Sequence, residues 1–155
     1  MEAVIFIGVQ GSGKTTFYKE RFFETHIRVS RDMLKTRHRE RLLVDACLAA
    51  KQAFVVDNTN SLRSQRAEHI GPAKAAGFRV VGYYFRCELA EALRRNAQRP
   101  KDRLIPPAGV VATFKRLQPP SFSEGFDELR VVEIDEANEF VEFRSRREEE
   151  GLPRD

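Results

Sequence analysis

A glycine-rich motif near the start of the chain constrains its fold more than any other feature. The segment Gly8-Val9-Gln10-Gly11-Ser12-Gly13-Lys14-Thr15 matches the pattern GxxxxGK(S/T) at every defined position. An apolar run at residues 2–7 precedes it, and a helical pattern follows over residues 14–25. A phosphate-binding loop requires this order, because the loop N–H groups and the positive end of the helix point at the same oxygens. The motif therefore predicts an α/β chain with a P-loop NTPase fold.

The residue types in this loop also predict how a nucleotide would bind. We expect the phosphates of ATP to be held by Gly11, Ser12, Gly13, Lys14, Thr15 and Thr16. Lys14 is expected to contact the β- and γ-phosphates and to stabilise the charge that develops during phosphoryl transfer. The hydroxyl of Thr15 is expected to bind Mg²⁺. ATP and Mg²⁺ are thus the expected cofactors, but the motif says nothing about the phosphate acceptor.

Apolar runs and helical patterns alternate along the rest of the chain. Further strands are predicted at residues 27–30, 53–56, 78–85 and 129–134, and helices at residues 31–51, 61–76, 88–98 and 108–117. One more short element is expected within residues 139–147. Alternating strands and helices predict a parallel sheet flanked by helices and joined by crossover connections. We expect one domain over residues 1–144 and a charged tail over residues 145–155, which carries Glu148, Glu149 and Glu150.

Composition argues against a membrane protein and leaves the meaning of the basic charge open. Of 155 residues, 41% are hydrophobic and 32% are charged, and no apolar run approaches the ~20 residues of a membrane span. We expect a cytoplasmic protein with no membrane partner, since no secretory signal precedes the glycine loop and the cysteines lack metal or redox spacing. The net charge is +4, and arginines crowd residues 28–41 and 94–103. Such clusters indicate either a solvated face or an anion-binding site.

The length favours a small P-loop kinase. Such an enzyme needs an acidic residue near the acceptor, a second polar group near the metal, and arginines that close over the phosphates. The chain is short for a GTPase with its switch regions, and it contains no NKxD element. Asp32 follows a predicted strand in the segment Ser30-Arg31-Asp32 and could accept the proton of an attacking hydroxyl. The alternative is that Asp32 only caps the following helix.

Two further segments would complete such a site. Residues 55–60, Val-Val-Asp-Asn-Thr-Asn, resemble a Walker B arrangement in which Asp57 holds the metal through a water molecule. The alternative is an ordinary polar turn after a strand. Arginines leave a helix and enter a proline-bounded loop at Arg95, Arg99 and Arg103, as in a lid that closes over ATP. The alternative is a solvated helix end that the helix dipole favours.

Taken together, these segments resemble the kinase domain of polynucleotide 5′-hydroxyl kinases, which include the bacteriophage polynucleotide kinase and the kinase half of kinase/3′-phosphatase repair proteins. The similarity extends over residues 4–134. It rests on residues 6–17, then on Ser30-Arg31-Asp32, Val56-Asp57-Asn58-Thr59-Asn60, Arg95-Asn96-Ala97-Gln98-Arg99, Ile105-Pro106, Pro119-Pro120 and Glu124-Gly125-Phe126-Asp127-Glu128-Leu129. Many unrelated proteins share the P-loop, whereas the DNTN segment and the PP…EGFDEL ending are far more restrictive.

The resemblance implies an adenylate-kinase-like architecture with a basic lid. Asp32 would be the general base, and Arg99 would be the lid arginine that contacts ATP, with Arg95 and Arg103 beside it. Residues 119–126 would enclose the adenine. The phosphatase half is not expected, because the chain has no DxDxT motif.

The resemblance also implies a set of substrate contacts. Asp57, Asn58 and Asn60 belong to the polar motif on the acceptor side. Lys35 falls where some members carry an arginine for the terminal phosphate of the substrate, and lysine cannot make that contact in bidentate form.

The activity implied is transfer of the γ-phosphate of ATP to the 5′-hydroxyl end of DNA or RNA. The basic cluster at residues 28–41 would guide a strand end, and the lack of an aromatic array suggests that only a few terminal nucleotides are bound. One alternative is a kinase of a small metabolite or antibiotic, which would not depend on nucleic-acid length or on salt. A second is a nucleotide-gated adaptor, against which the joint presence of Asp32, Asp57 and Arg99 argues.

Overall fold

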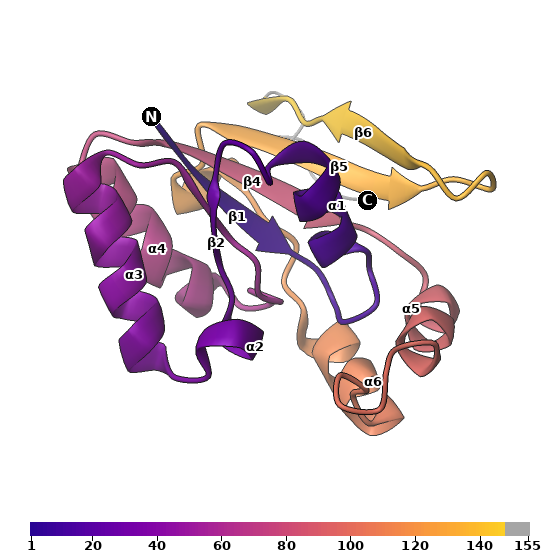
Figure 1. Ribbon diagram of the computed structural model, residues 1–155. Helices are drawn as coiled ribbons and strands as arrows, with labels where there is room; N and C mark the ends of the chain where they lie inside the picture. Colours follow the sequence, from indigo (N-terminus) through magenta and orange to yellow (C-terminus); the bar gives the residue numbers. More distant parts are fainter. Residues whose placement is uncertain (148–155) are drawn as a thin grey trace.

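The computed structural model describes residues 1–147 and contains a six-stranded sheet (Figure 1). The strands are β1 (Glu2–Ile7), β2 (Ile27–Val29), β3 (Phe54–Val56), β4 (Arg79–Phe85), β5 (Glu128–Ile134) and β6 (Phe140–Arg144). Their order in the sheet is β2-β3-β1-β4-β5-β6. Strands β1 to β5 run parallel, and β6 pairs with β5 in the antiparallel direction. The predicted α/β fold with a mostly parallel sheet is confirmed.

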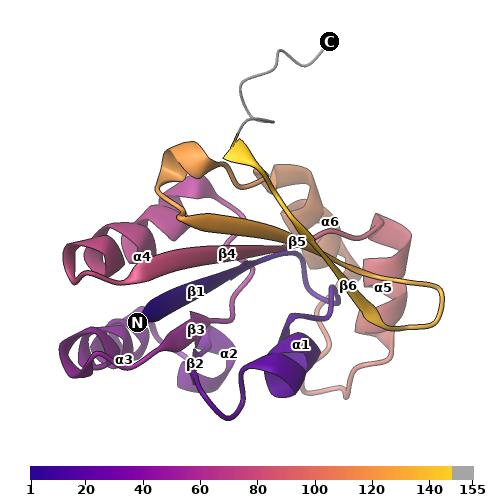
Figure 2. The ribbon, with the colours of Figure 1, turned by 90° about the horizontal axis from the view of Figure 1, so that it is seen from above.

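Helices flank this sheet and extend beyond it. They are α1 (Lys14–Arg21), α2 (Arg31–Leu34), α3 (Arg37–Ala50), α4 (Arg63–Ala75), α5 (Leu89–Ala97) and α6 (Pro107–Arg116), with a 3₁₀ turn, η1 (Phe122–Glu124). Helices α3 and α4 lie together at one side of the molecule, and α5 and α6 form a separate pair at the other side (Figures 1 and 2). The α5–α6 pair is thus set apart from the helices that cover the sheet.

Alternating side chains of β1 divide the main core into two layers. Ile5 packs on one face of the sheet with Val44 of α3 and Ile70 of α4. Phe6 packs on the opposite face with Phe17 of α1. Each such side chain contributes about 1.5–3 kcal/mol when it is fully removed from water. Strand β1 is therefore fixed from both sides, and this fixes the loop that follows it.

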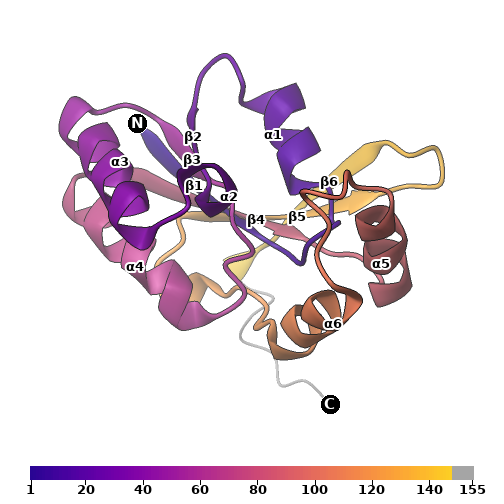
Figure 3. The same cartoon turned by 60° about the horizontal axis from the view of Figure 1, so that its bottom comes forward.

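A third apolar cluster anchors the α5–α6 pair beside that loop. Its buried members are Val9 of the glycine loop, Ala92 of α5 and Val110 of α6. Because Val9 belongs to the glycine loop itself, the two helices are attached directly to it. Figure 3 shows α5 and α6 on one side of the loop that follows β1, and α2 on the other.

The single helix predicted over residues 31–51 is wrong, because two helices, α2 and α3, occupy this stretch. Between them, Lys35 takes a positive φ of 74°, which ends α2. Thr36 then caps α3, since its side-chain oxygen accepts a hydrogen bond from the backbone N–H of Arg39 at 3.1 Å. Thr36 is a typical N-cap residue, but the helical spacing of apolar residues continues across it and hides the start of the second helix.

Other element predictions differ only at their boundaries. The helix expected over residues 14–25 ends at Arg21, and the helix expected from Ser61 begins at Arg63. The short element expected in residues 139–147 is the antiparallel strand β6. No helix within residues 1–147 is long and apolar enough to cross a membrane. The acidic residues Glu148, Glu149 and Glu150 lie outside the described residues.

Candidate active site

A cleft of about 1410 Å³ opens at the carboxyl edge of the sheet. Its walls come from the P-loop, from α2, from the loop after β3, from α5 and from the hairpin between β5 and β6. Ligands of open α/β sheets gather at this edge, where the strands end and the connecting loops diverge. The cleft therefore brings together segments that are far apart in the sequence.

The P-loop has the backbone shape that its glycines predict. Gly11 and Gly13 take positive φ angles of 82° and 96°. A Cβ atom on Gly11 would lie 2.4 Å from the carbonyl oxygen of Ala92, so a side chain there would push α5 away from the loop. Both glycines and Thr16 line the cleft.

Lys14 lies inside the P-loop, where its charge is costly. The side chain is buried, and Nζ donates hydrogen bonds of 2.8 Å to the carbonyl oxygens of Gly8 and Val9. Burial lowers the pKa of Lys14 to about 8, the nearby Asp57 opposes this shift, and the positive charge of Arg99 reinforces it. A phosphate in the loop would stabilise the ammonium group, as expected for a phosphate-binding lysine.

The two residues predicted to hold Mg²⁺ lie in contact. The hydroxyl of Thr15 donates to Oδ2 of Asp57 at 3.0 Å, and Asp57 is buried at the end of β3. A hydroxyl and a carboxylate are hard oxygen ligands, and Mg²⁺ prefers these together with several water molecules. The donor set therefore fits the metal. Arg28 also reaches this point, with Nε 2.8 Å from the same Asp57 oxygen.

Asp32 lies on α2 and lines the cleft with an exposed carboxylate. Ser30 is the N-cap of α2 and Thr36 is the N-cap of α3, so the alternative in which Asp32 caps the next helix is wrong. Among the described residues, Arg31 and Arg37 line the cleft on this side, whereas Lys35 does not. Lys35 lies instead in the turn that separates α2 from α3.

Asn58 fixes the position of α2. Its Oδ1 accepts from the backbone N–H of Arg31 at 2.9 Å, and its Nδ2 donates to Glu40 at 3.1 Å. Glu40 is buried, receives the guanidinium of Arg31 at 3.3 Å, and lies 3.6 Å from Nε2 of His69. Burial lowers the pKa of His69, and Glu40 opposes this effect. Asn58 thereby positions the backbone that carries the candidate base.

Asn60, predicted to bind substrate, lines the cleft, and its side-chain amide nitrogen is engaged with the backbone. The side chain is buried, and Nδ2 donates to the carbonyl oxygens of Phe6 at 2.8 Å and of Val56 at 3.4 Å. The amide nitrogen is therefore used to tie the loop after β3 to the end of β1. These hydrogen bonds hold in place the loop after β3, which forms part of the cleft wall.

The predicted lid corresponds to α5 and the loop that follows it. Arg95 and Arg99 line the cleft, whereas Arg103, also among the described residues, does not. The buried Asn96 closes this loop, since Nδ2 donates to the carbonyl oxygen of Ile105 at 2.6 Å and Oδ1 accepts from its N–H at 3.1 Å. Arg95 is held by Glu91 at 3.6 Å. Arg99 is the lid arginine whose positive charge acts on Lys14 and lowers its pKa.

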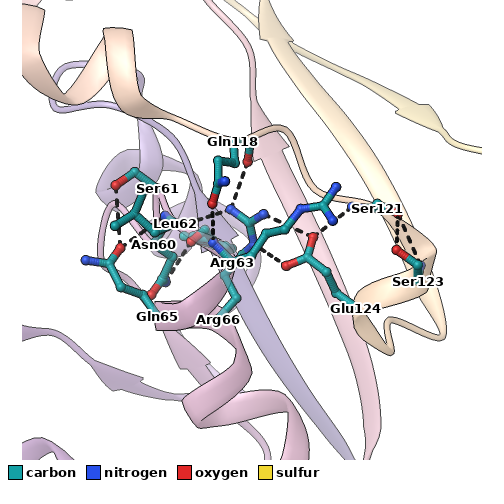
Figure 4. A network of polar contacts seen from close by, with 11 residues as sticks. Asn60, Ser61, Leu62, Arg63, Gln65, Arg66, Gln118, Ser121, Ser123 and Glu124 are labelled. Atoms are coloured by element: carbon teal, nitrogen blue, oxygen red, sulfur yellow. Dashed lines mark hydrogen bonds and ion pairs between the residues drawn. The ribbon is translucent and has the colours of Figure 1, made fainter.

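Residues 119–126, expected to enclose adenine, lie elsewhere. None of them lines the cleft in the described part of the chain, and Glu124 forms an ion pair with Arg66 of α4 (Figure 4). The wall of the cleft beside the P-loop is formed instead by Ile134, Asp135 and Phe140 of the β5–β6 hairpin. The restrictive PP…EGFDEL ending is thus a packing feature, and the hairpin is the candidate wall for a nucleobase.

Arg28, Glu40, His69 and the Arg66–Glu124 pair were not predicted as parts of this region. Each is defined by a partner distant in the sequence, and no local spacing identifies such a pair. The only local signal was the arginine cluster that contains Arg28 and Arg31.

The strand–P-loop–helix unit, the acidic residue on α2 and the lid arginines define a protein with a P-loop kinase-like fold. The AAA domain family (AAA_33) matches the chain over residues 28–120, and the chain belongs to this family. The matched stretch begins after the P-loop and includes Asp32, Asp57 and the lid.

Solved structures support the same fold. Kti12 of Chaetomium thermophilum in complex with ADP-AlF3 is 18% identical, with a TM-score of 0.62 over 88% of this chain and 92% of that one. A gluconokinase of Sinorhizobium meliloti 1021 is 18% identical, with a TM-score of 0.55 over 85% and 82%. AvrRxo1-ORF1:AvrRxo1-ORF2 with sulphate ions is 15% identical, with a TM-score of 0.66 over 91% of this chain and 57% of that one. At these identities the likeness establishes the fold alone.

Proposed function

We propose that the protein is an ATP-dependent kinase that phosphorylates the 5′-hydroxyl end of a polynucleotide. The observation that carries this proposal is Asp32, an exposed carboxylate that faces the same cleft as the P-loop. Asn58 holds the backbone next to it, so the carboxylate stands on a fixed element. A rigid acid on the acceptor side is what phosphoryl transfer to a hydroxyl needs.

Each residue of the candidate site would have a distinct role in phosphoryl transfer. Asp32 accepts the proton of the acceptor hydroxyl as its oxygen attacks the γ-phosphorus. The bond from the γ-phosphorus to the bridging oxygen breaks, and ADP leaves. Lys14 and Arg99 stabilise the charge on the transferring group and the bridging oxygen. Thr15 and Asp57 would hold Mg²⁺, which neutralises phosphate charge when it is bound.

The shape and charge of the acceptor side support a polynucleotide end. The cleft is open, and Arg31 and Arg37 lie on the same wall as Asp32. Guanidinium groups bind phosphates well, and a strand end offers phosphates on the 3′ side of its terminal nucleoside. The resemblance to polynucleotide 5′-hydroxyl kinases agrees with this assignment. A small-metabolite kinase is the second candidate, because a gluconokinase shares the fold.

Transfer of labelled γ-phosphate from Mg·ATP to short 5′-hydroxyl DNA and RNA oligonucleotides tests the proposal. We expect labelled ends with the wild type and a loss of at least ~10²-fold in rate with Asp32→Asn and with Lys14→Ala. Asp45→Asn is the matched control, since Asp45 is an exposed aspartate on α3 that does not line the cleft. A wild type that binds ATP and labels gluconate or another polyol, but no oligonucleotide, would instead establish the metabolite kinase.

A further inference from the structure

Arg28 lies where the metal would bind, and its role there differs from that of the other arginines. It lies on β2, and its side chain is 23% exposed, whereas that of Asp57 is 2% exposed. Nε donates to Oδ2 of Asp57 at 2.8 Å, and Nη2 donates to the hydroxyl of Thr15 at 3.3 Å. Arg28 therefore contacts both candidate ligands of Mg²⁺ at once.

The pairing has a clear physical reason. A buried carboxylate without a counter-charge is strongly unfavourable, and the guanidinium of Arg28 provides that charge for Asp57. Thr15 donates its proton to the same Oδ2 atom. The hydroxyl oxygen of Thr15 and Oδ2 of Asp57, the candidate metal ligands, are thus both hydrogen-bonded to protein groups. Thr15, Asp57 and Arg28 form a triad in which each residue contacts the other two.

Binding of Mg²⁺ must open this triad. The hydroxyl of Thr15 has to turn a lone pair toward the ion, and Asp57 has to accept water bound to the ion. A divalent cation whose bound water donates to Asp57 would lie close to the Arg28 guanidinium, and two cations repel each other in a partly buried site. The metal therefore disfavours the position that Arg28 now occupies.

We propose that Arg28 competes with Mg²⁺ for Asp57 and so sets the magnesium concentration at which nucleotide binds. The inference rests on the Mg·nucleotide site of the proposed function but not on the identity of the acceptor. The guanidinium stabilises the buried carboxylate of Asp57, so Mg²⁺ has to compete with it and binds at a higher concentration. Removing its charge lowers the magnesium requirement, because no ion pair has to break and no neighbouring cation repels the metal.

The test uses fluorescent ADP and purified protein, with Mg²⁺ varied at fixed nucleotide concentration. Arg28→Met keeps the apolar stem without charge, and Arg28→Gln also keeps a hydrogen-bond donor for Asp57. We expect the half-saturating Mg²⁺ concentration to fall about tenfold in Arg28→Met and several-fold in Arg28→Gln, because a hydrogen bond to a charged group no longer has to break. Arg41→Met is the matched control, since Arg41 is exposed on α3 and does not line the cleft.

A second readout follows from the buried carboxylate. Without Mg²⁺, Arg28→Met should melt at a lower temperature than wild type, and Mg²⁺ should recover more of its stability than it recovers in wild type. If Arg28→Gln and Arg28→Met, folded by circular dichroism, require as much Mg²⁺ as wild type or more, the competition is refuted and the proposed kinase stands. If wild type itself binds no Mg·ADP at any concentration, both proposals fail together.

Discussion

At the scale of single residues, Lys14 carries the charge expected to bind nucleotide phosphates. Burial lowers the pKa of its ammonium group, so this charge is lost at a lower pH than in a free lysine. The pKa of Lys14 falls from 10.5 to about 8 in the folded protein. Between these two values the unfolded chain holds a proton on this lysine that the folded chain has lost. The free energy of unfolding therefore rises with pH between these two values. Below about pH 8 the lysine is charged in both states, and the full cost of burying its charge destabilises the folded protein.

Nucleotide binding should show the opposite dependence on pH, because a phosphate binds the charged form of Lys14. We expect the affinity for Mg·ADP to be constant from pH 6.5 to 7.5 and to weaken by up to about tenfold per unit above pH 8. Isothermal titration calorimetry in matched buffers measures this profile. Lys14→Met should bind weakly with no pH dependence above pH 7.5, and a steep profile in that variant would assign the titration to another group.

At the scale of elements, one buried ion pair joins α4 to the segment that leads from α6 into β5. Arg66 is fully buried, and its guanidinium donates to Glu124 at 2.7 and 3.0 Å (Figure 4). Nη1 also donates to the carbonyl oxygens of Asn60 and Gln118, each at 2.9 Å. The pair thus connects the loop after β3 with the return of the chain from the lid.

Breaking this pair should be costly, because it leaves a buried guanidinium without a counter-charge. We expect Glu124→Gln to reduce the free energy of unfolding by about 3–5 kcal/mol, which lowers the melting temperature by roughly 6–20 °C for a chain of this size. Glu68→Gln is the matched control, since it breaks the exposed Arg37–Glu68 pair and should cost under ~1 kcal/mol. Equal melting temperatures for the two variants would show that the Arg66 network carries no special stability.

Elements with strong local signals were predictable, and those defined by tertiary partners were not. The P-loop and its flanking strand and helix follow from residues 2–25 alone, because glycine spacing and apolar periodicity act locally. The break between α2 and α3 depends on the backbone of Lys35 and the cap at Thr36, two features that periodicity hides. The place of Glu124 depends on Arg66, which lies far away in the sequence.

The same distinction holds for the site. Thr15 and Asp57 could be paired from sequence, because a P-loop and the end of a parallel strand meet at one sheet edge. Arg28 could not be placed there, since an arginine on a short strand is indistinguishable from a solvated one until its neighbours are known. The hydrogen bond from Asn60 to Phe6 could not be predicted for a related reason, because a buried contact with another strand leaves no signal in the local polar pattern.

At the scale of the whole molecule, acidic residues offset most of the basic charge. The net charge of +4 coexists with many arginines that already face a carboxylate. Ion pairs of this kind involve Arg21, Arg28, Arg31, Arg37, Arg66, Arg79, Arg86, Arg94, Arg95, Arg130 and Arg144. Because 23 acidic residues offset 27 basic ones, the net charge that sets the long-range field is only +4, and a nucleic acid would be held by few contacts near the cleft.

Salt dependence measures how many phosphates a bound strand contacts. If the strand end is held mainly by Arg31 and Arg37, whose guanidiniums would exchange Glu40 and Glu68 for phosphates, the logarithm of oligonucleotide affinity should fall with the logarithm of salt concentration with a slope of about −1.4. Arg37→Gln should reduce that slope by about 0.7, whereas Arg41→Gln, which removes an equal charge outside the cleft, should leave it unchanged. Fluorescence anisotropy with oligonucleotides of increasing length checks both values, and affinity should stop increasing after the first few nucleotides.

A slope of −4 or steeper would indicate a long binding track over the surface, and a slope near zero would favour a small, uncharged acceptor. Because the two outcomes lie on opposite sides of the expected value, one titration series separates an end-binding kinase from both alternatives.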